Sequence, residues 1–88
     1  MTTTETRDLG TASYLLCLGY TVKTVEARQA QHRRAVYIIL ETDRTAAEVV
    51  ADDTTYKLNK ALVRPQQYRD AYKYLSDRVH DKLRGGGQ

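Results

Sequence analysis

Ser76, Asp77 and His80 bring the side-chain types of a hydrolytic triad together on one predicted helix, with Asp81 beside them. In such a triad the histidine accepts the serine proton and the carboxylate orients the histidine. Here every member lies on one convex helix surface. That surface supplies no oxyanion hole, no pocket and no exclusion of water. The sequence therefore predicts a protein that is not an enzyme.

The cysteine and histidine content argues against metal and cofactor chemistry. The chain has one cysteine, Cys17, and two histidines, His32 and His80, without the spacing of a zinc site. A single cysteine also excludes an internal disulfide framework, as is usual in a reducing compartment. We expect no metal and no cofactor.

Apolar runs in this 88-residue chain are short. The longest, Tyr14–Leu18 and Ala35–Leu40, fall far below the roughly 20 residues that cross a bilayer. The N-terminal Met1–Asp8 lacks the basic start and apolar core of a signal peptide. These observations predict a cytoplasmic protein with no membrane partner.

Positive charge is concentrated in the second half of the chain. Residues 54–88 carry eight Lys or Arg against three Asp or Glu, whereas residues 1–53 carry six against eight. Basic clusters can follow a phosphate backbone. In the second half the residues that would do so are Arg69 and Lys73. A second basic cluster lies in the first half, on the predicted hairpin, and consists of Arg28, Arg33 and Arg34.

A second feature opposes nucleic-acid binding by the C-terminal helix. Asp70, Asp77 and Asp81 form an acidic stripe next to Arg69 and Lys73. Such a stripe repels phosphates and is typical of a mixed, solvated helix face. Nucleic acid and an acidic protein therefore both stand as alternative partners.

Helix and strand signals follow one another along the chain. Thr6 or Asp8 can begin a first helix that ends at Leu18, before Gly19. Residues 20–27 and 35–40 are rich in β-branched side chains and predict two strands, the second of them central. Residues 28–34 predict a basic hairpin loop, although residues 24–34 could instead form helix.

The second half predicts two more helices. Thr42 or Asp43 can cap a short helix ending near Ala51. One of the short apolar pieces 56–58 and 61–63 then adds an edge strand. Pro65 can begin a final helix to about Leu83. Its apolar stripe consists of Tyr68, Tyr72, Leu75, Val79 and Leu83.

The predicted fold class is α+β. We expect one domain over residues 1–88, with flexible tails at 1–5 and 85–88. A small sheet of two to three mainly antiparallel strands is packed by three helices. The predicted order is helix, strand, strand, helix, strand, helix.

The first predicted helix is apolar on two faces. One face is directed at the core, and the other carries Gly10, Tyr14, Cys17 and Leu18. A helix that is apolar all round must be covered all round. Either the C-terminal helix covers this second face or another copy of the chain does. The interface hypothesis assigns Tyr14, Cys17 and Leu18 to contact between copies.

Cys17 adds a redox element to that hypothesis. Two copies related by a two-fold axis would bring Cys17 to Cys17, which permits an intermolecular disulfide if the Cα atoms approach within roughly 7 Å. The alternative is a buried thiol that packs as a small hydrophobic group.

Three stretches together resemble a family of small uncharacterised bacterial and phage proteins, a domain of unknown function. They are DLGTASYLLCLGY, AVYIILE and VRPQQYRDAYKYL, within residues 6–83. The chain departs from that pattern in its longer, more basic hairpin turn, which lacks glycine. The resemblance implies a phage or mobile-element context, an accessory role in the host cytoplasm, and no catalytic residue.

The leading functional hypothesis is a non-enzymatic accessory protein that acts by self-association and protein contacts through Tyr14, Cys17 and Leu18. The alternative is a nucleic-acid-binding protein that uses the basic hairpin at residues 28–34 and the C-terminal helix.

Overall fold

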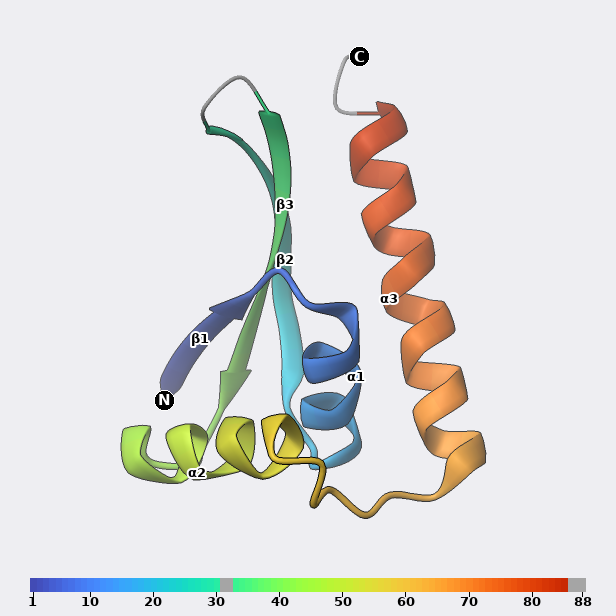
Figure 1. Ribbon diagram of the computed structural model, residues 1–88. Coiled ribbons are helices and arrows are strands. Elements are labelled where there is room, and N and C mark those ends of the chain that lie inside the picture. The colour runs from blue at the N-terminus through green and yellow to red at the C-terminus, as the bar shows by residue number, and fades with distance from the viewer. Residues whose placement is uncertain (31–32, 86–88) are drawn as a thin grey trace.

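The computed structural model describes residues 1–30 and 33–85, and it has the α+β fold that the sequence predicts. Figure 1 shows a long β-hairpin, with one helix packed beside its lower half and a long helix running alongside. Residues 31–32 of the expected hairpin loop and 86–88 of the expected tail lie outside the described residues. The elements are β1 (Thr2–Thr6), α1 (Leu9–Cys17), β2 (Thr21–Ala30), β3 (Arg33–Thr42), α2 (Ala46–Lys57) and α3 (Pro65–Gly85).

β3 is the central strand of a three-stranded antiparallel sheet with the order β1-β3-β2. β1 pairs with residues 38–42 of β3, and β2 pairs with residues 33–41. Consecutive residues of a strand face opposite sides of the sheet. Ile38, Ile39 and Leu40 are nevertheless all buried, so β3 is covered on both faces here. Its unbroken apolar run predicts this.

The third strand lies at the start of the chain, which corrects two predictions. Residues 1–5, expected to be a flexible tail, supply most of β1. The pieces 56–58 and 61–63, expected to give an edge strand, belong to the end of α2 and to an irregular connection. The β-branched threonines Thr2–Thr4 suit an extended strand, and β3 offers them its unpaired edge. The order is therefore β-α-β-β-α-α.

α1 begins and ends where its sequence signals predict. The Asp8 carboxylate accepts hydrogen bonds from the backbone N–H of Gly10 at 3.3 Å and of Thr11 at 3.1 Å. These bonds satisfy donors that the first helical turn leaves free. The helix ends before Gly19, whose φ of 100° is in the left-handed region.

α2 begins and ends later than predicted. Its N-cap is Thr45, whose hydroxyl accepts from the Glu48 N–H at 3.2 Å while the Glu48 carboxylate accepts from the Thr45 N–H at 2.9 Å. This reciprocal pair is a capping box. Residues 52–55, expected to end the helix, continue it, and the Thr55 hydroxyl donates to the Ala51 carbonyl at 2.8 Å.

α3 begins at Pro65 as predicted and packs mainly against α1. Leu75 is fully buried, and Tyr68 and Val79 are half-buried. Tyr72 and Leu83 are each 42% exposed, so the predicted stripe packs along its centre and stays open at one edge. Within the described ranges, no helix is long and apolar enough to span a bilayer. The connected core cluster consists of Ala12, Tyr14, Leu15, Tyr20, Ile38, Leu40, Val49 and Leu75, and Val25, Ala35 and Ile39 are buried outside it.

A buried carboxylate ties α2 to the sheet. Asp52 is 8% exposed, and the Tyr20 hydroxyl donates to its Oδ2 at 2.7 Å. The Arg44 Nη2 donates to its Oδ1 at 3.2 Å. Burial and the hydrogen bond to Asp52 raise the pKa of Tyr20. Because an unpartnered buried carboxylate is costly, this cluster fixes the position of α2.

Replacing Tyr20 with phenylalanine should lower the free energy of unfolding by about 1.5–3 kcal/mol, the usual contribution of a hydrogen bond to a charged group. Chemical denaturation measures this change. Tyr37→Phe is the matched control, because the Tyr37 hydroxyl makes no hydrogen bond within the described residues. Equal losses in the two variants would contradict the role given to the Tyr20 hydroxyl.

Candidate functional site

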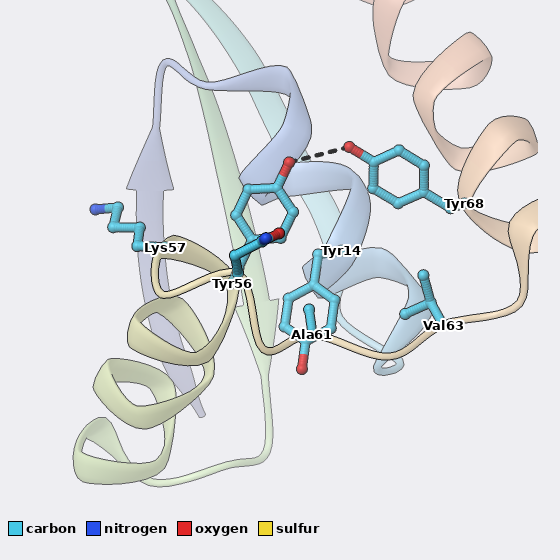
Figure 2. Close-up of a pocket in the computed structure, with 7 residues that line it drawn as sticks. Tyr14, Tyr56, Lys57, Ala61, Val63 and Tyr68 are labelled. Carbon is cyan, nitrogen blue, oxygen red and sulfur yellow. Dashed lines mark hydrogen bonds between the residues drawn. The ribbon is translucent and has the colours of Figure 1, made fainter.

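Four of the seven tyrosines form one connected series across the three helices. The rings of Tyr14 and Tyr56 stack with centroids 5.6 Å apart. The hydroxyls of Tyr56 and Tyr68 are hydrogen-bonded at 3.1 Å, as Figure 2 shows. The rings of Tyr68 and Tyr72 follow with centroids 6.2 Å apart. The series leads from a buried ring, Tyr14, to an open one, Tyr72.

Gly10 on α1 allows the two hydroxyls to meet over the helix. A Cβ atom at this position would collide with the Tyr56 hydroxyl, and it would lie 3.2 Å from the Tyr68 hydroxyl. Tyr56 comes from the last turn of α2, and Tyr68 comes from the first turns of α3. The absence of a side chain at Gly10 therefore sets where three helices join.

The connection between α2 and α3 has an inner and an outer side. Asn59, with a φ of 61°, takes the left-handed conformation that turns the chain after α2. Ala61 and Val63 pack against the core cluster. Leu62, between them, is 93% exposed, and Leu58 is 59% exposed. The connection thus covers the core and also presents leucines to solvent.

A cavity of about 460 Å³ lies between this connection, α1 and the start of α3. In Figure 2 the chain carrying Ala61 and Val63 passes over Tyr14, and Tyr68 faces them from α3. The volume falls within the range of ligand and anchor pockets, roughly 300–1,000 Å³. We call it the tyrosine pocket; it is lined by Tyr14, Tyr56, Lys57, Asn59, Ala61, Val63 and Tyr68.

Charge lies at the border of the tyrosine pocket. The Lys57 side chain points away from the tyrosine rings in Figure 2, and its Nζ lies 2.9 Å from an Asp53 carboxylate oxygen. Burial, followed by the hydrogen bond with Tyr56, raises the pKa of Tyr68. The phenol of Tyr68 therefore stays neutral near pH 7 and offers hydrogen bonding but no base.

A second, shallow and largely open hollow of about 490 Å³ lies on the surface of α3 and shares Tyr68 with the tyrosine pocket. Its rings are those of Tyr68 and Tyr72, and its bases are Arg69 and Lys73. The Lys73 Nζ lies 3.5 Å from Asp77. We call it the helix groove; it is lined by Tyr68, Arg69, Tyr72, Lys73, Ser76 and Asp77.

The predicted interface residues of α1 occupy different environments. Tyr14 is 6% exposed and packs against Tyr56 inside the protein. Cys17 is half-buried, and burial raises the pKa of its thiol, which lowers its reactivity. Leu18 is 39% exposed and is the C-cap of the helix. The covering of α1 comes largely from α3, one of the two alternatives that its pattern leaves open.

The basic residues proposed for nucleic-acid binding do not form one surface. Arg28 is paired with Glu5 and Glu26 at 3.0 Å each, and its guanidinium lies 4.4 Å from the Tyr37 ring centroid. The Arg34 Nη1 donates to the Leu83 carbonyl at 3.5 Å. Nothing is described for the side chain of Arg33. Arg69 and Lys73 lie together in the helix groove.

Tyr56 and Leu62 are not among the site residues that the sequence predicts. The capping-box pattern at Thr45 and Glu48 would have placed Tyr56 on a helix. No sequence signal separates the exposed Leu62 from its inward neighbours Ala61 and Val63. Across the described residues, no group of three histidine, cysteine or acidic side chains is placed to hold a metal ion.

Gly10→Ala should lower the free energy of unfolding by about 1–2 kcal/mol, because crowding at the Tyr56 hydroxyl outweighs the better helix propensity of alanine. The same substitution should cost less in a Tyr56→Phe background, which lacks the atom that the methyl group meets. A double-mutant cycle by chemical denaturation measures this coupling. Additive effects of the two substitutions would contradict it.

The raised pKa of Tyr68 makes stability sensitive to alkali. The folded state favours the neutral phenol, so its contribution is fully present below the ordinary pKa of 10.0 and is lost as pH rises above that value. Above that pH, ionisation of one tyrosine with a raised pKa should lower the free energy of unfolding by about 1.4 kcal/mol per pH unit. Denaturation followed through pH 10.0 should show a shallower decline for Tyr68→Phe than for the unmodified chain. The same decline of stability with pH in both proteins would contradict the raised pKa of Tyr68.

Comparison with protein-family models, with curated proteins and with solved structures finds no match to this chain. The family resemblance of residues 6–83 therefore stays a prediction. The tyrosine pocket and the helix groove are the observations from which function can be inferred.

Proposed function

We propose that this protein is a non-enzymatic accessory protein that acts by self-association, with Leu62 of one copy entering the tyrosine pocket of another. The observation that carries this proposal is that Leu62 is 93% exposed, while its two neighbours in the chain, Ala61 and Val63, line the pocket. A projecting leucine and an aromatic recess thus belong to one surface.

Self-complementarity of this kind suits a two-fold contact. In an isologous interface the same patch is used on both copies, so a projection and a recess must lie side by side. Leu62 and the pocket satisfy that requirement. Burial of one leucine side chain contributes about 1.5–3 kcal/mol, and a two-fold contact gains it twice. Aromatic walls are typical of the residues that dominate binding energy at interfaces.

Two further leucines can extend the contact. Leu58 and Leu18 are the C-caps of α2 and α1, and both are exposed. In Figure 1 the ends of these helices and the start of the connection lie at the same lower end of the molecule. In this proposal Leu18 lies in the contact, whereas Tyr14 contributes as a wall of the pocket.

The contact is proposed as noncovalent. The Cys17 thiol is half-buried with a raised pKa, so it is a poor thiolate at neutral pH. A disulfide between copies is therefore secondary to apolar packing. The proposal places the protein in the cytoplasm, where single cysteines usually stay reduced.

Leu62→Asp should convert an oligomer of the unmodified chain into a monomer, because it places a charge against the tyrosine rings. Light scattering coupled to size exclusion, over a wide range of concentrations, measures the mass. Val50→Asp is the matched control: Val50 is 66% exposed on α2 and does not line the tyrosine pocket. It should leave the mass unchanged.

Two results would overturn self-association through Leu62. One is a monomer at every concentration for the unmodified chain, which would direct the search to an acidic protein partner. The other is equal loss of assembly in the Leu62 and Val50 variants. Cys17→Ser and added reductant should both leave the mass unchanged.

A further inference from the structure

We infer that the helix groove binds single-stranded nucleic acid, with a base stacked on Tyr72 and phosphates bound by Arg69 and Lys73. This activity is separate from self-association, because the groove runs along α3 and Leu62 is not among its lining residues.

Tyr72 has the properties of a stacking platform. Its side chain is 42% exposed, and the Tyr68 ring supports it at a centroid distance of 6.2 Å and an interplanar angle of 36°. Tyr68 is in turn fixed by its hydrogen bond with Tyr56. An exposed ring with this support loses little conformational freedom on binding. Such rings stack on bases of any sequence, because every base has a π-face.

Arg69 and Lys73 provide charge complementarity beside that ring. They lie four residues apart on α3, so they project from neighbouring positions on one side of the helix. Arg69 is exposed and forms no ion pair within the described residues. Ser76 is small and lines the same groove. A sugar-phosphate backbone can therefore approach while its base reaches Tyr72.

The arrangement favours a single strand over a duplex. In a duplex the bases are already stacked and paired, so a ring on a convex helix cannot reach a base face. Only the phosphates would then contact the protein, and Tyr72 would contribute little. Dependence of binding on Tyr72 is thus the signature of the single-stranded mode.

Asp77 opposes binding and gives the inference a second test. Its carboxylate lies 3.5 Å from the Lys73 Nζ and lines the groove, so it competes with phosphate for this lysine. Removing its charge should strengthen binding. A merely structural role of the Lys73–Asp77 pair would not produce a gain.

The experiment is an anisotropy titration of a labelled single-stranded oligodeoxythymidylate and of a duplex, at low and at moderate salt. The unmodified chain should bind the single strand more tightly, and the affinity should fall as salt rises. Tyr72→Ala should reduce affinity roughly five-fold to a hundred-fold, the effect of one lost base–aromatic stack. Asp77→Asn should raise it.

The matched control is Tyr74→Ala. Tyr74 is 50% exposed on the same helix but lies outside the groove, where its hydroxyl accepts from Arg78 at 3.0 Å. It should bind as the unmodified chain does.

Absence of binding at low salt would overturn the inference. So would equal losses in the Tyr72 and Tyr74 variants, or a Tyr72→Ala variant that binds normally while circular dichroism shows it folded.

Discussion

Burial of α1 on every side is the constraint on which the rest of the structure depends. Six consecutive residues, Gly10 to Leu15, are buried, so this stretch leaves no face for solvent. The hydroxyls of its threonine and serine have partners within the helix and its cap: Thr11 donates to Asp8 and Ser13 donates to the Leu9 carbonyl, at 2.6 Å each. Because these two hydroxyls are hydrogen-bonded, they can be buried without leaving an unpaired polar group. The sheet, α2 and α3 provide the enclosure.

The tyrosine series lies where α2 and α3 meet over α1 and complete its burial. Where α1, α2 and α3 converge, each ring contributes apolar area while its hydroxyl can remain bonded or wet. Tyr56 and Tyr68 use each other as partners, which a phenylalanine at either position would prevent. The convergence is incomplete at its outer edge, where Tyr72 is left open. The residues that pack the three helices together therefore also line the two surface hollows, which share Tyr68.

Local chemistry was sufficient to predict the fold class but not every element. Pro65, Gly19 and the apolar run of β3 each mark an element within a few residues, and each is confirmed. The strand at residues 2–6 forms only by pairing with residues 38–42, which no local signal specifies. The true length of α2 likewise depends on a hydrogen bond between Asp52 and a tyrosine 32 residues away. Tyr14, Arg69 and Lys73 are predicted from the sequence. The tyrosine pocket that Tyr14 lines arises from the packing of three helices, whereas the helix groove is lined by residues of α3 alone.

Because β1 is shorter than β3, part of one edge of β3 has no neighbouring strand, and arginine side chains lie near that edge. β1 reaches only as far as Ile38, so residues 34–37 of β3 have no strand partner on that edge within the described part of the chain. An open edge of this kind invites strand addition by another molecule and leads to aggregation. Arg34 is exposed on this stretch, and the guanidinium groups of Arg7 and Arg28 lie near the Tyr37 ring. The exposed charges of Arg7 and Arg34 make this edge a poorer template for a further strand.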